Sequence, residues 1–182
     1  MLWLWAIPNT YPNKRIGTIV KNSGTDRFEF LKGTIMDDSI VESPRINFKC
    51  DEKYLLDVLP SNGGLLIVSE KVLQILKKLC PEDIQEFKAN VFAKEKFIDG
   101  YFLLNITNTV DVFDSEKCEF SKYMGAITAI KKIAYKTDSL SEHDIARNAE
   151  FKSHVLVSDR LKDIFEKEKI KGVEFRDATI VV

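Results

Sequence analysis

Two stretches of this chain repeat one pattern, Leu65-Leu66-Ile67-Val68-Ser69-Glu70-Lys71-Val72-Leu73-Gln74-Ile75-Leu76 and Val155-Leu156-Val157-Ser158-Asp159-Arg160-Leu161-Lys162-Asp163-Ile164-Phe165. Each begins with a short apolar run rich in β-branched residues, which predicts a buried strand. Apolar residues then recur at helical spacing after the serine, which predicts an amphipathic helix. Ser69 and Ser158 occupy the N-cap position, where a hydroxyl can accept a free backbone N–H of the first turn. Glu70 and Asp159 place negative charge at the positive end of each helix dipole. We therefore predict two similar strand-helix units that cover one core.

The two strand-to-helix junctions do not have the composition of phosphate-binding loops. Such loops place glycines between the strand and the helix, where bare backbone amides can surround an anion. Here Gly63 and Gly64 precede the first strand, and each helix begins with an acidic residue that repels phosphate. We interpret both junctions as structural elements and not as nucleotide sites.

The composition is typical of a soluble globular protein. Of the 182 residues, 45% are hydrophobic and 30% are charged, which suffices for one core or two small lobes. The 27 basic and 28 acidic side chains nearly balance, so no global field attracts nucleic acid or an anionic membrane. The apolar residues 1–7 lack a basic region and are too short for a signal sequence or a membrane span. We expect a cytoplasmic protein with no nucleic-acid and no membrane partner.

The cysteines and histidines do not form a metal-binding or nucleophilic motif. Cys50, Cys80 and Cys118 are neither at metal-knuckle spacing nor an even disulfide set. A catalytic thiolate needs a histidine partner, whereas His143 lies in a polar segment and His154 directly precedes a strand. We interpret the three cysteines as reduced structural thiols and expect neither a metal nor another cofactor.

Turn residues divide the first third of the chain into short predicted strands. The alternating segments 27–31 and 45–50 are typical of half-buried antiparallel strands. Residues 2–7 are apolar on both faces, which favours a central buried strand; the alternative is that Trp3 and Trp5 contribute to a partner surface. The break at residues 57–64 is the best candidate for a lobe boundary. We predict a single domain, 1–182, with possible lobes at 1–60 and 61–182.

The rest of the chain mixes strands and helices without strict alternation. Pro81 suits the start of a further helix because proline is tolerated in the first helical turn. Residues 137–149 are polar and predict a loop with a short helix. Strands are predicted at 91–93, 101–105, 126–135, 173–175 and 178–182. The expected class is therefore α+β, with a mixed, largely antiparallel sheet, the two strand-helix units packed on it and a β-rich N-terminal part.

Several segments follow one another in an order that resembles a bacterial family of immunity proteins. They are Gly63–Glu70, Tyr101–Asn105 with Asn108, Asp111 and Asp114, His143–Arg147, Val155–Leu161 and Gly172–Phe175. The family is the one numbered eleven among the immunity proteins of polymorphic toxin systems, and the resemblance runs from about Leu59 to Phe175. Ala146 departs from the family pattern, which usually has an aromatic residue before the arginine. The resemblance therefore does not establish how the residues around Arg147 pack.

The resemblance implies a non-enzymatic antidote, encoded beside a secreted toxin, that binds this cognate toxin in the cytoplasm and blocks it. The family-like polar residues are expected to have structural roles; they are Ser69, Asp111, Asp114, Arg147 and Ser158. Asp114-Ser115 is typical of a turn after a strand end. Arg147 either clamps a carboxylate or phosphate, or forms a salt bridge with an acid such as Asp111 or Asp144.

Two other classes of protein remain as alternatives. A small hydrolase or transferase would use Asp111, Asp114, His143 and Arg147, and it predicts that these side chains converge in one pocket. A scaffold subunit would instead have a large isologous interface. The sequence leaves the oligomeric state open.

Toxin contact is expected from the N-terminal third. An antidote must discriminate its toxin from related toxins, and such discrimination is built from variable loops. We predict contact by Tyr11, Lys14 and Arg15, and by the acidic turn Asp37-Asp38, because these residues combine exposure with aromatic or charged groups. The alternative is that both segments are ordinary solvated loops.

Overall fold

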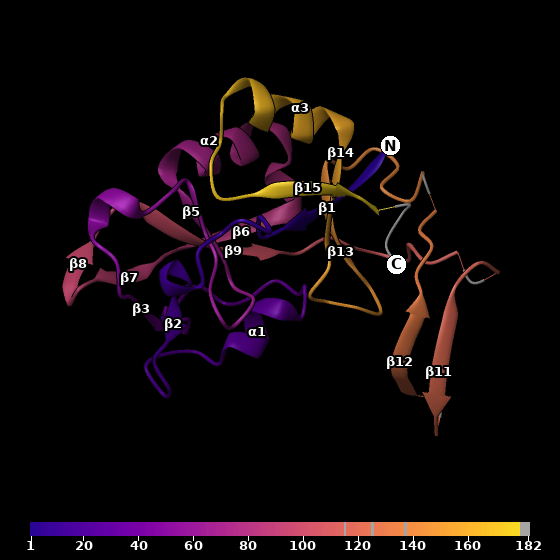
Figure 1. Cartoon of the computed structure of the whole chain (residues 1–182), viewed down its shortest axis with the longest axis horizontal. Helices are drawn as coiled ribbons and strands as arrows, with labels where there is room; N and C mark the ends of the chain where they lie inside the picture. The colour runs from indigo at the N-terminus through magenta and orange to yellow at the C-terminus, as the bar shows by residue number, and fades with distance from the viewer. Residues whose placement is uncertain (115, 125, 137, 179–182) are drawn as a thin grey trace.

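Strands make up most of the regular structure of the chain; the two longer helices lie together on one side of them, and the shortest helix lies on the opposite side (Figure 1). The computed structural model describes residues 1–178 apart from 115, 125 and 137. The helices are α1 (Arg27–Leu31), α2 (Glu70–Leu79) and α3 (Asp159–Lys167), and the 3₁₀ turns are η1 (Asn13–Arg15), η2 (Glu52–Tyr54) and η3 (Pro81–Asp83). Within the described residues, no helix is long and apolar enough to cross a membrane.

The strands of the described residues form three larger sheets and a hairpin. One sheet has the order β10-β13-β14-β1-β15, with β1 (Leu2–Ala6), β10 (Thr109–Val110), β13 (Ile145–Asn148), β14 (Val155–Ser158) and β15 (Glu174–Asp177). A second has the order β4-β5-β9-β6, with β4 (Val58–Leu59), β5 (Leu66–Ser69), β6 (Ile84–Lys88) and β9 (Tyr101–Ile106). The third is β2-β3-β7-β8, with β2 (Thr18–Ile19), β3 (Arg45–Phe48), β7 (Asn90–Ala93) and β8 (Lys96–Ile98). The hairpin joins β11 (Glu119–Tyr123) to β12 (Ala126–Lys132).

The strand pairs are antiparallel except for β3 with β7 and β10 with β13. This arrangement confirms the predicted α+β class with mixed, largely antiparallel pairing. It differs from the expectation of one sheet, because the two strand-helix units start from different sheets: β5 leads into α2 and β14 leads into α3.

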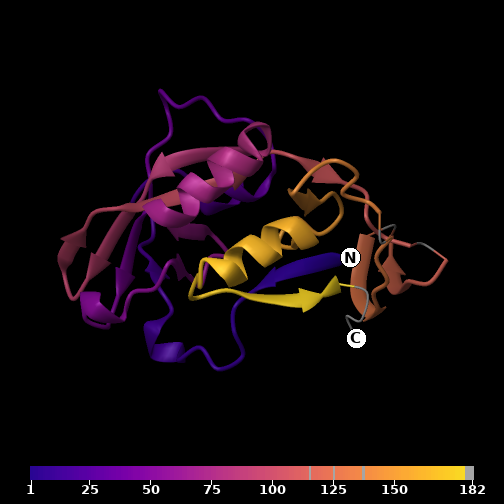
Figure 2. The same ribbon diagram turned by 90° about the horizontal axis from the view of Figure 1, so that it is seen from above.

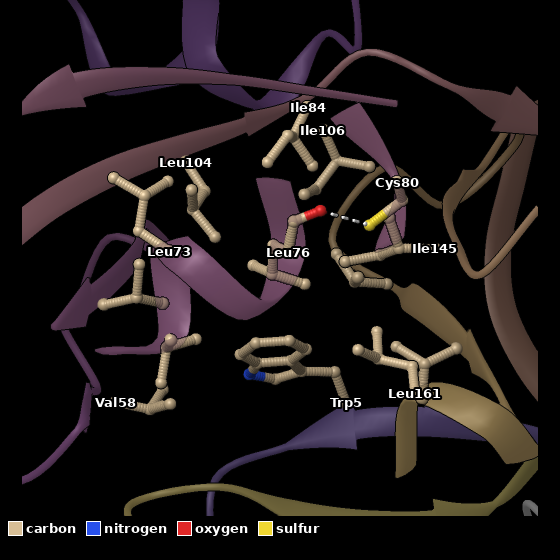
Figure 3. Close-up of a cluster of buried hydrophobic side chains, with 14 of the residues drawn as sticks. Trp5, Val58, Leu73, Leu76, Cys80, Ile84, Leu104, Ile106, Ile145 and Leu161 are labelled. Carbon is tan, nitrogen blue, oxygen red and sulfur yellow. Dashed lines mark hydrogen bonds between the residues drawn. The ribbon is translucent and has the colours of Figure 1, made fainter. Parts of the chain in front are cut away.

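The two units nevertheless cover one core, as predicted. Figure 2 shows α2 and α3 side by side, and residues of both helices enter a single apolar cluster with Trp5 at its centre. The Trp5 ring lies below Leu76 and between Val58 and Leu161 in Figure 3, and it meets Phe165 edge-on at 5.4 Å between ring centroids. The members of this cluster on the two helices are Val72, Leu73, Leu76, Leu161 and Phe165.

The two N-cap serines behave differently. Ser158 accepts a hydrogen bond from Leu161 N at 3.2 Å and donates to Asp144 Oδ1 at 2.5 Å. Ser69 lies at the N-cap position of α2 without a side-chain cap hydrogen bond. Its hydroxyl donates to Asp57 Oδ1 at 3.5 Å instead, so the predicted cap is confirmed only for Ser158.

Strand β1 is a central strand with both faces covered, as its sequence predicts. It pairs with β14 on one side and with β15 on the other. Leu2 and Trp5 enter two different apolar clusters. Trp3 is also used within the molecule, because its Nε1 donates to Asp159 Oδ1 at 2.8 Å and Lys162 Nζ lies 4.7 Å from its ring.

The predicted strand at 27–31 is wrong, because these residues form α1. Phe28 and Phe30 would share one face of a strand, whereas Phe30 is buried and Phe28 is exposed, as helical spacing allows. The deciding group is Asp26, whose side chain accepts a hydrogen bond from Phe28 N and caps the helix.

Two further predictions differ from the structure, and the strand predicted at 178–182 lies almost wholly outside the described residues. Pro81 begins only the turn η3, after which the chain becomes β6. The short helix expected within 137–149 is wrong, because Ile145–Asn148 is the fully buried strand β13. Ala178 is buried outside β15, and residues 179–182 lie outside the described residues.

Candidate functional site

The segment between α1 and β3 exposes large apolar side chains between acidic ones. Residues 34–43, here called the acidic loop, contain Asp37, Asp38 and Glu42 and no basic residue. Ile35 is 82% exposed and Ile40 is 74% exposed. Figure 2 shows this violet segment projecting at the top of the molecule. An exposed isoleucine is ordinary by itself, but two beside three acids on one projecting loop mark a candidate docking surface.

The backbone of the acidic loop is held by two side-chain amides from the β4-β5-β9-β6 sheet. Gln85 Nε2 donates to Met36 O and to Asp38 Oδ1, both at 2.7 Å. Met36 N donates back to Gln85 Oε1 at 3.0 Å, and Asn105 Nδ2 donates to Thr34 O at 2.7 Å. Ile35 therefore projects into solvent from an ordered backbone.

The two acidic residues predicted as toxin contacts both lie exposed on this loop. Asp37 Oδ1 accepts hydrogen bonds from Ser39 Oγ at 2.7 Å and from Ser39 N at 2.9 Å. These bonds hold the pKa of Asp37 below its ordinary value, chiefly through the Ser39 hydroxyl. Asp37 is therefore ionised at neutral pH in a defined turn.

Tyr11, Lys14 and Arg15 lie elsewhere. In Figure 2 the turn η1, which carries Lys14 and Arg15, is on the opposite side from the acidic loop. Lys14 is exposed, and the Arg15 guanidinium lies 4.5 Å from the centroid of the Tyr54 ring. Tyr11 is only 9% exposed, contrary to the expectation of an exposed anchor. The structure therefore separates the predicted contact residues into two groups.

Asp111 and Asp114 each contact a lysine. Asp111 is exposed, and its Oδ2 lies 3.5 Å from Lys136 Nζ. Asp114 Oδ2 lies 2.8 Å from Lys117 Nζ, which lowers the pKa of Asp114. The Asp114 carbonyl accepts from Lys117 N and from Cys118 N, so the residue opens a turn as its sequence predicts.

His143 and Arg147 have different partners again. The His143 ring, through Nδ1, lies 2.8 Å from Asp83 Oδ1. Arg147 is 1% exposed, and its Nη1 donates to Lys152 O at 2.6 Å. Its Nη2 donates to Phe30 O at 3.2 Å, and burial lowers its pKa to about 10. The four side chains named for a hydrolase or transferase thus contact four separate sets of groups.

Of the two alternatives given for Arg147, the salt bridge to Asp111 or Asp144 is not the arrangement found. Asp111 pairs with Lys136, and Asp144 accepts from Ser158 and lies 3.4 Å from Arg160. Arg147 donates to two backbone carbonyls, because the short strand β13 places it inside the fold and not at an edge. Through these two hydrogen bonds it joins α1 to the segment that follows β13.

Sequence reasoning missed the exposed isoleucines and the amides behind them. Ile35 and Ile40 flank an acidic turn, and apolar residues in a turn-rich segment are a usable signal. Gln85 and Asn105 carry no such signal, because each lies about fifty to seventy positions from the backbone it holds.

Comparison with known protein families gives one match to nearly the whole chain. The family model described as immunity protein family (Imm11) matches residues 10–179 of 182. The match includes both strand-helix units, and it also includes the acidic loop and η1, which lie N-terminal to the segments that carry the resemblance. No curated protein matches the chain.

Proposed function

This chain belongs to the immunity protein family Imm11, and we propose that it binds and neutralises a cognate secreted toxin in the bacterial cytoplasm as a non-enzymatic inhibitor. Family membership supports this role, and the separate partners of Asp111, Asp114, His143 and Arg147 favour an inhibitor over a hydrolase or transferase. The toxin contact is then a protein surface and not a substrate pocket.

We place that contact on the acidic loop, and the observation that carries this placement is its ordered backbone beneath two exposed isoleucines. Burying an isoleucine side chain contributes about 1.5–3 kcal/mol. A loop already held by Gln85 and Asn105 loses little conformational entropy when it binds. Ile35 and Ile40 can therefore act as anchors at low entropic cost.

The charge of the loop specifies the chemistry of its partner. Asp37, Asp38 and Glu42 surround the isoleucines without a basic side chain in the same segment. A complementary toxin face would carry apolar sockets with lysine or arginine around them, and such charges also accelerate encounter. We therefore expect the association rate constant to fall as the salt concentration rises.

The test pairs this chain with the toxin encoded beside its gene. Co-expression should restore growth, and the purified proteins should co-elute. In a double variant, Ile35→Ser with Ile40→Ser, we expect the dissociation constant to rise at least about a hundredfold, since each anchor is worth about tenfold or more.

The matched control is Met124→Ser, which removes another large exposed apolar side chain, in the turn between β11 and β12. We expect it to leave the affinity for the toxin unchanged. Growth no better than without this protein would refute the immunity role. Restored growth with equal affinities for both variants would instead move the contact away from the acidic loop.

A further inference from the structure

A second surface of the molecule concentrates positive charge. Two adjoining hollows of about 420 and 480 Å³ share Asp51 and Lys94 in their linings. We call them together the basic hollow. Six cationic side chains line it against the carboxylates of Asp51 and Glu52; the cations are Lys14, Arg15, Lys49, Lys53, Lys94 and Lys96. This is a strong local excess in a chain whose formal net charge is −1.

The two carboxylates of the basic hollow are already engaged. Asp51 Oδ1 lies 2.7 Å from Lys94 Nζ, and Glu52 Oε2 lies 2.8 Å from Lys96 Nζ. Among the residues that the structure describes, Lys14 and Lys49 have no ion-pair partner. Their ammonium groups are exposed and available to an external anion.

Arg15 and Lys53 also lack a carboxylate partner within the described part of the chain, and both face the Tyr54 ring. The Arg15 guanidinium lies 4.5 Å and Lys53 Nζ 5.1 Å from the ring centroid. These contacts orient two further cations at the hollow. They also occupy the ring, so Tyr54 is not a free platform for a nucleic-acid base.

A buried hydroxyl beside the hollow has no hydrogen-bond partner. Tyr11 Oη is buried and unpaired within the described residues. Burial is the main cause that raises the pKa of the Tyr11 phenol above its ordinary value. Tyr11 lines neither of the two hollows, so this hydroxyl is not part of the surface that a ligand would meet.

We propose that the basic hollow binds a polypeptide segment with clustered aspartate or glutamate side chains. Several separate ammonium groups match a row of carboxylates, whereas a single-stranded nucleic acid would need exposed aromatic faces as well. The turn η1, which contributes Lys14 and Arg15 to the hollow, lies on the side of the molecule opposite to the acidic loop (Figure 2), so this site goes beyond the toxin contact placed there. Binding here does not depend on that contact.

The test uses a fluorescent peptide of eight glutamates, the full chain and a salt concentration of about 0.15 M. Fluorescence anisotropy should show saturable binding. The double variant Lys14→Glu with Lys49→Glu should raise the dissociation constant at least about tenfold, because it reverses both unpaired cations.

The control is Lys78→Glu with Lys167→Glu, which changes the net charge equally on the exposed faces of α2 and α3. We expect this control to change the dissociation constant less than about twofold, with the folding of both variants verified by circular dichroism. Equal weakening by both double variants, or no saturable binding, overturns the proposal. Tighter binding of a single-stranded oligothymidylate of eight nucleotides also overturns it, because the ligand class is then phosphate. None of these results depends on the toxin, so they leave the immunity role to its own test.

Discussion

Arg147 donates through Nη2 to the carbonyl oxygen of Phe30, a residue 117 positions away, at 3.2 Å. Its other terminal nitrogen donates to Lys152 O at 2.6 Å. One buried side chain thus joins β13 to the C-terminal part of α1, immediately before the acidic loop. The partial negative charge at a helix C-terminus offsets part of the cost of burying this cation without a carboxylate.

Replacing Arg147 should destabilise the fold. In Arg147→Ala, we expect the free energy of unfolding to fall by about 3 kcal/mol, because one buried and one partly buried carbonyl lose their donor and a cavity forms. Arg147→Met keeps much of the volume and buries no charge, so its loss should be smaller. Urea unfolding measures both, and a loss below about 1 kcal/mol in Arg147→Ala would contradict the joining role.

The two N-cap serines should respond unequally to alanine. Ser158→Ala removes both the cap on Leu161 N and the hydrogen bond to Asp144, so we expect a loss of about 1–2 kcal/mol. Ser69→Ala removes only a long contact to Asp57, and its loss should stay below about 0.5 kcal/mol. Thermal and urea unfolding of the two variants compare them directly; equal losses would show that Ser69 caps α2 in solution.

Removing Gln85 should loosen the acidic loop without unfolding the protein. Gln85→Ala deletes the partner of Met36 N and of Met36 O. Amide hydrogen exchange at Met36 should therefore accelerate by about tenfold or more, since local opening then costs less. Gln74→Ala, on the exposed face of α2, is the control and should leave that exchange rate unchanged. Unaltered exchange at Met36 in Gln85→Ala would mean that the amide does not hold the loop.

The buried hydroxyl of Tyr11 should be dispensable for stability. Tyr11→Phe keeps the ring and removes an unpaired polar group, so the free energy of unfolding should stay constant or rise by about 1 kcal/mol. Tyr101→Phe is the matched comparison, because its hydroxyl donates to Leu56 O at 3.1 Å. We expect that variant to lose about 1 kcal/mol, and the opposite ranking in urea unfolding would contradict the assignment.

His154 should make stability depend on pH below neutrality. Nδ1 of its ring lies 2.6 Å from Tyr135 Oη, and burial holds the pKa of His154 below the ordinary 6.5. In the unfolded chain the ring gains a proton as the pH falls through about 6.5, whereas the folded state does so only at lower pH. The free energy of unfolding should therefore decrease from pH 6.5 down to the folded pKa. His154→Gln should lack this part of the decrease in urea titrations, and identical pH profiles would refute it.

The sequence predicted the elements whose conformation is set by residues within a few positions of one another. The units around Ser69 and Ser158 were predictable because periodicity and cap position act within a few residues. The helix at residues 27–31 was not predictable, because five alternating residues fit a strand or a helix. The N-cap hydrogen bond that Asp26 accepts favours the helix. The exposed isoleucines of the acidic loop were visible in the sequence, but their ordered backbone was not.

The sequence by itself determined the α+β class, the two strand-helix units, the buried strand β1 and the membership of an immunity family, since these follow from local pattern and segment order. Only the tertiary structure decided that Arg147 binds carbonyls instead of a carboxylate, that Tyr11 is buried, and that Gln85 holds the acidic loop. Each of these depends on which distant groups packing brings within hydrogen-bond distance. The chemistry of a side chain limits which groups it can bind, whereas the fold determines which of those groups lie within hydrogen-bond distance.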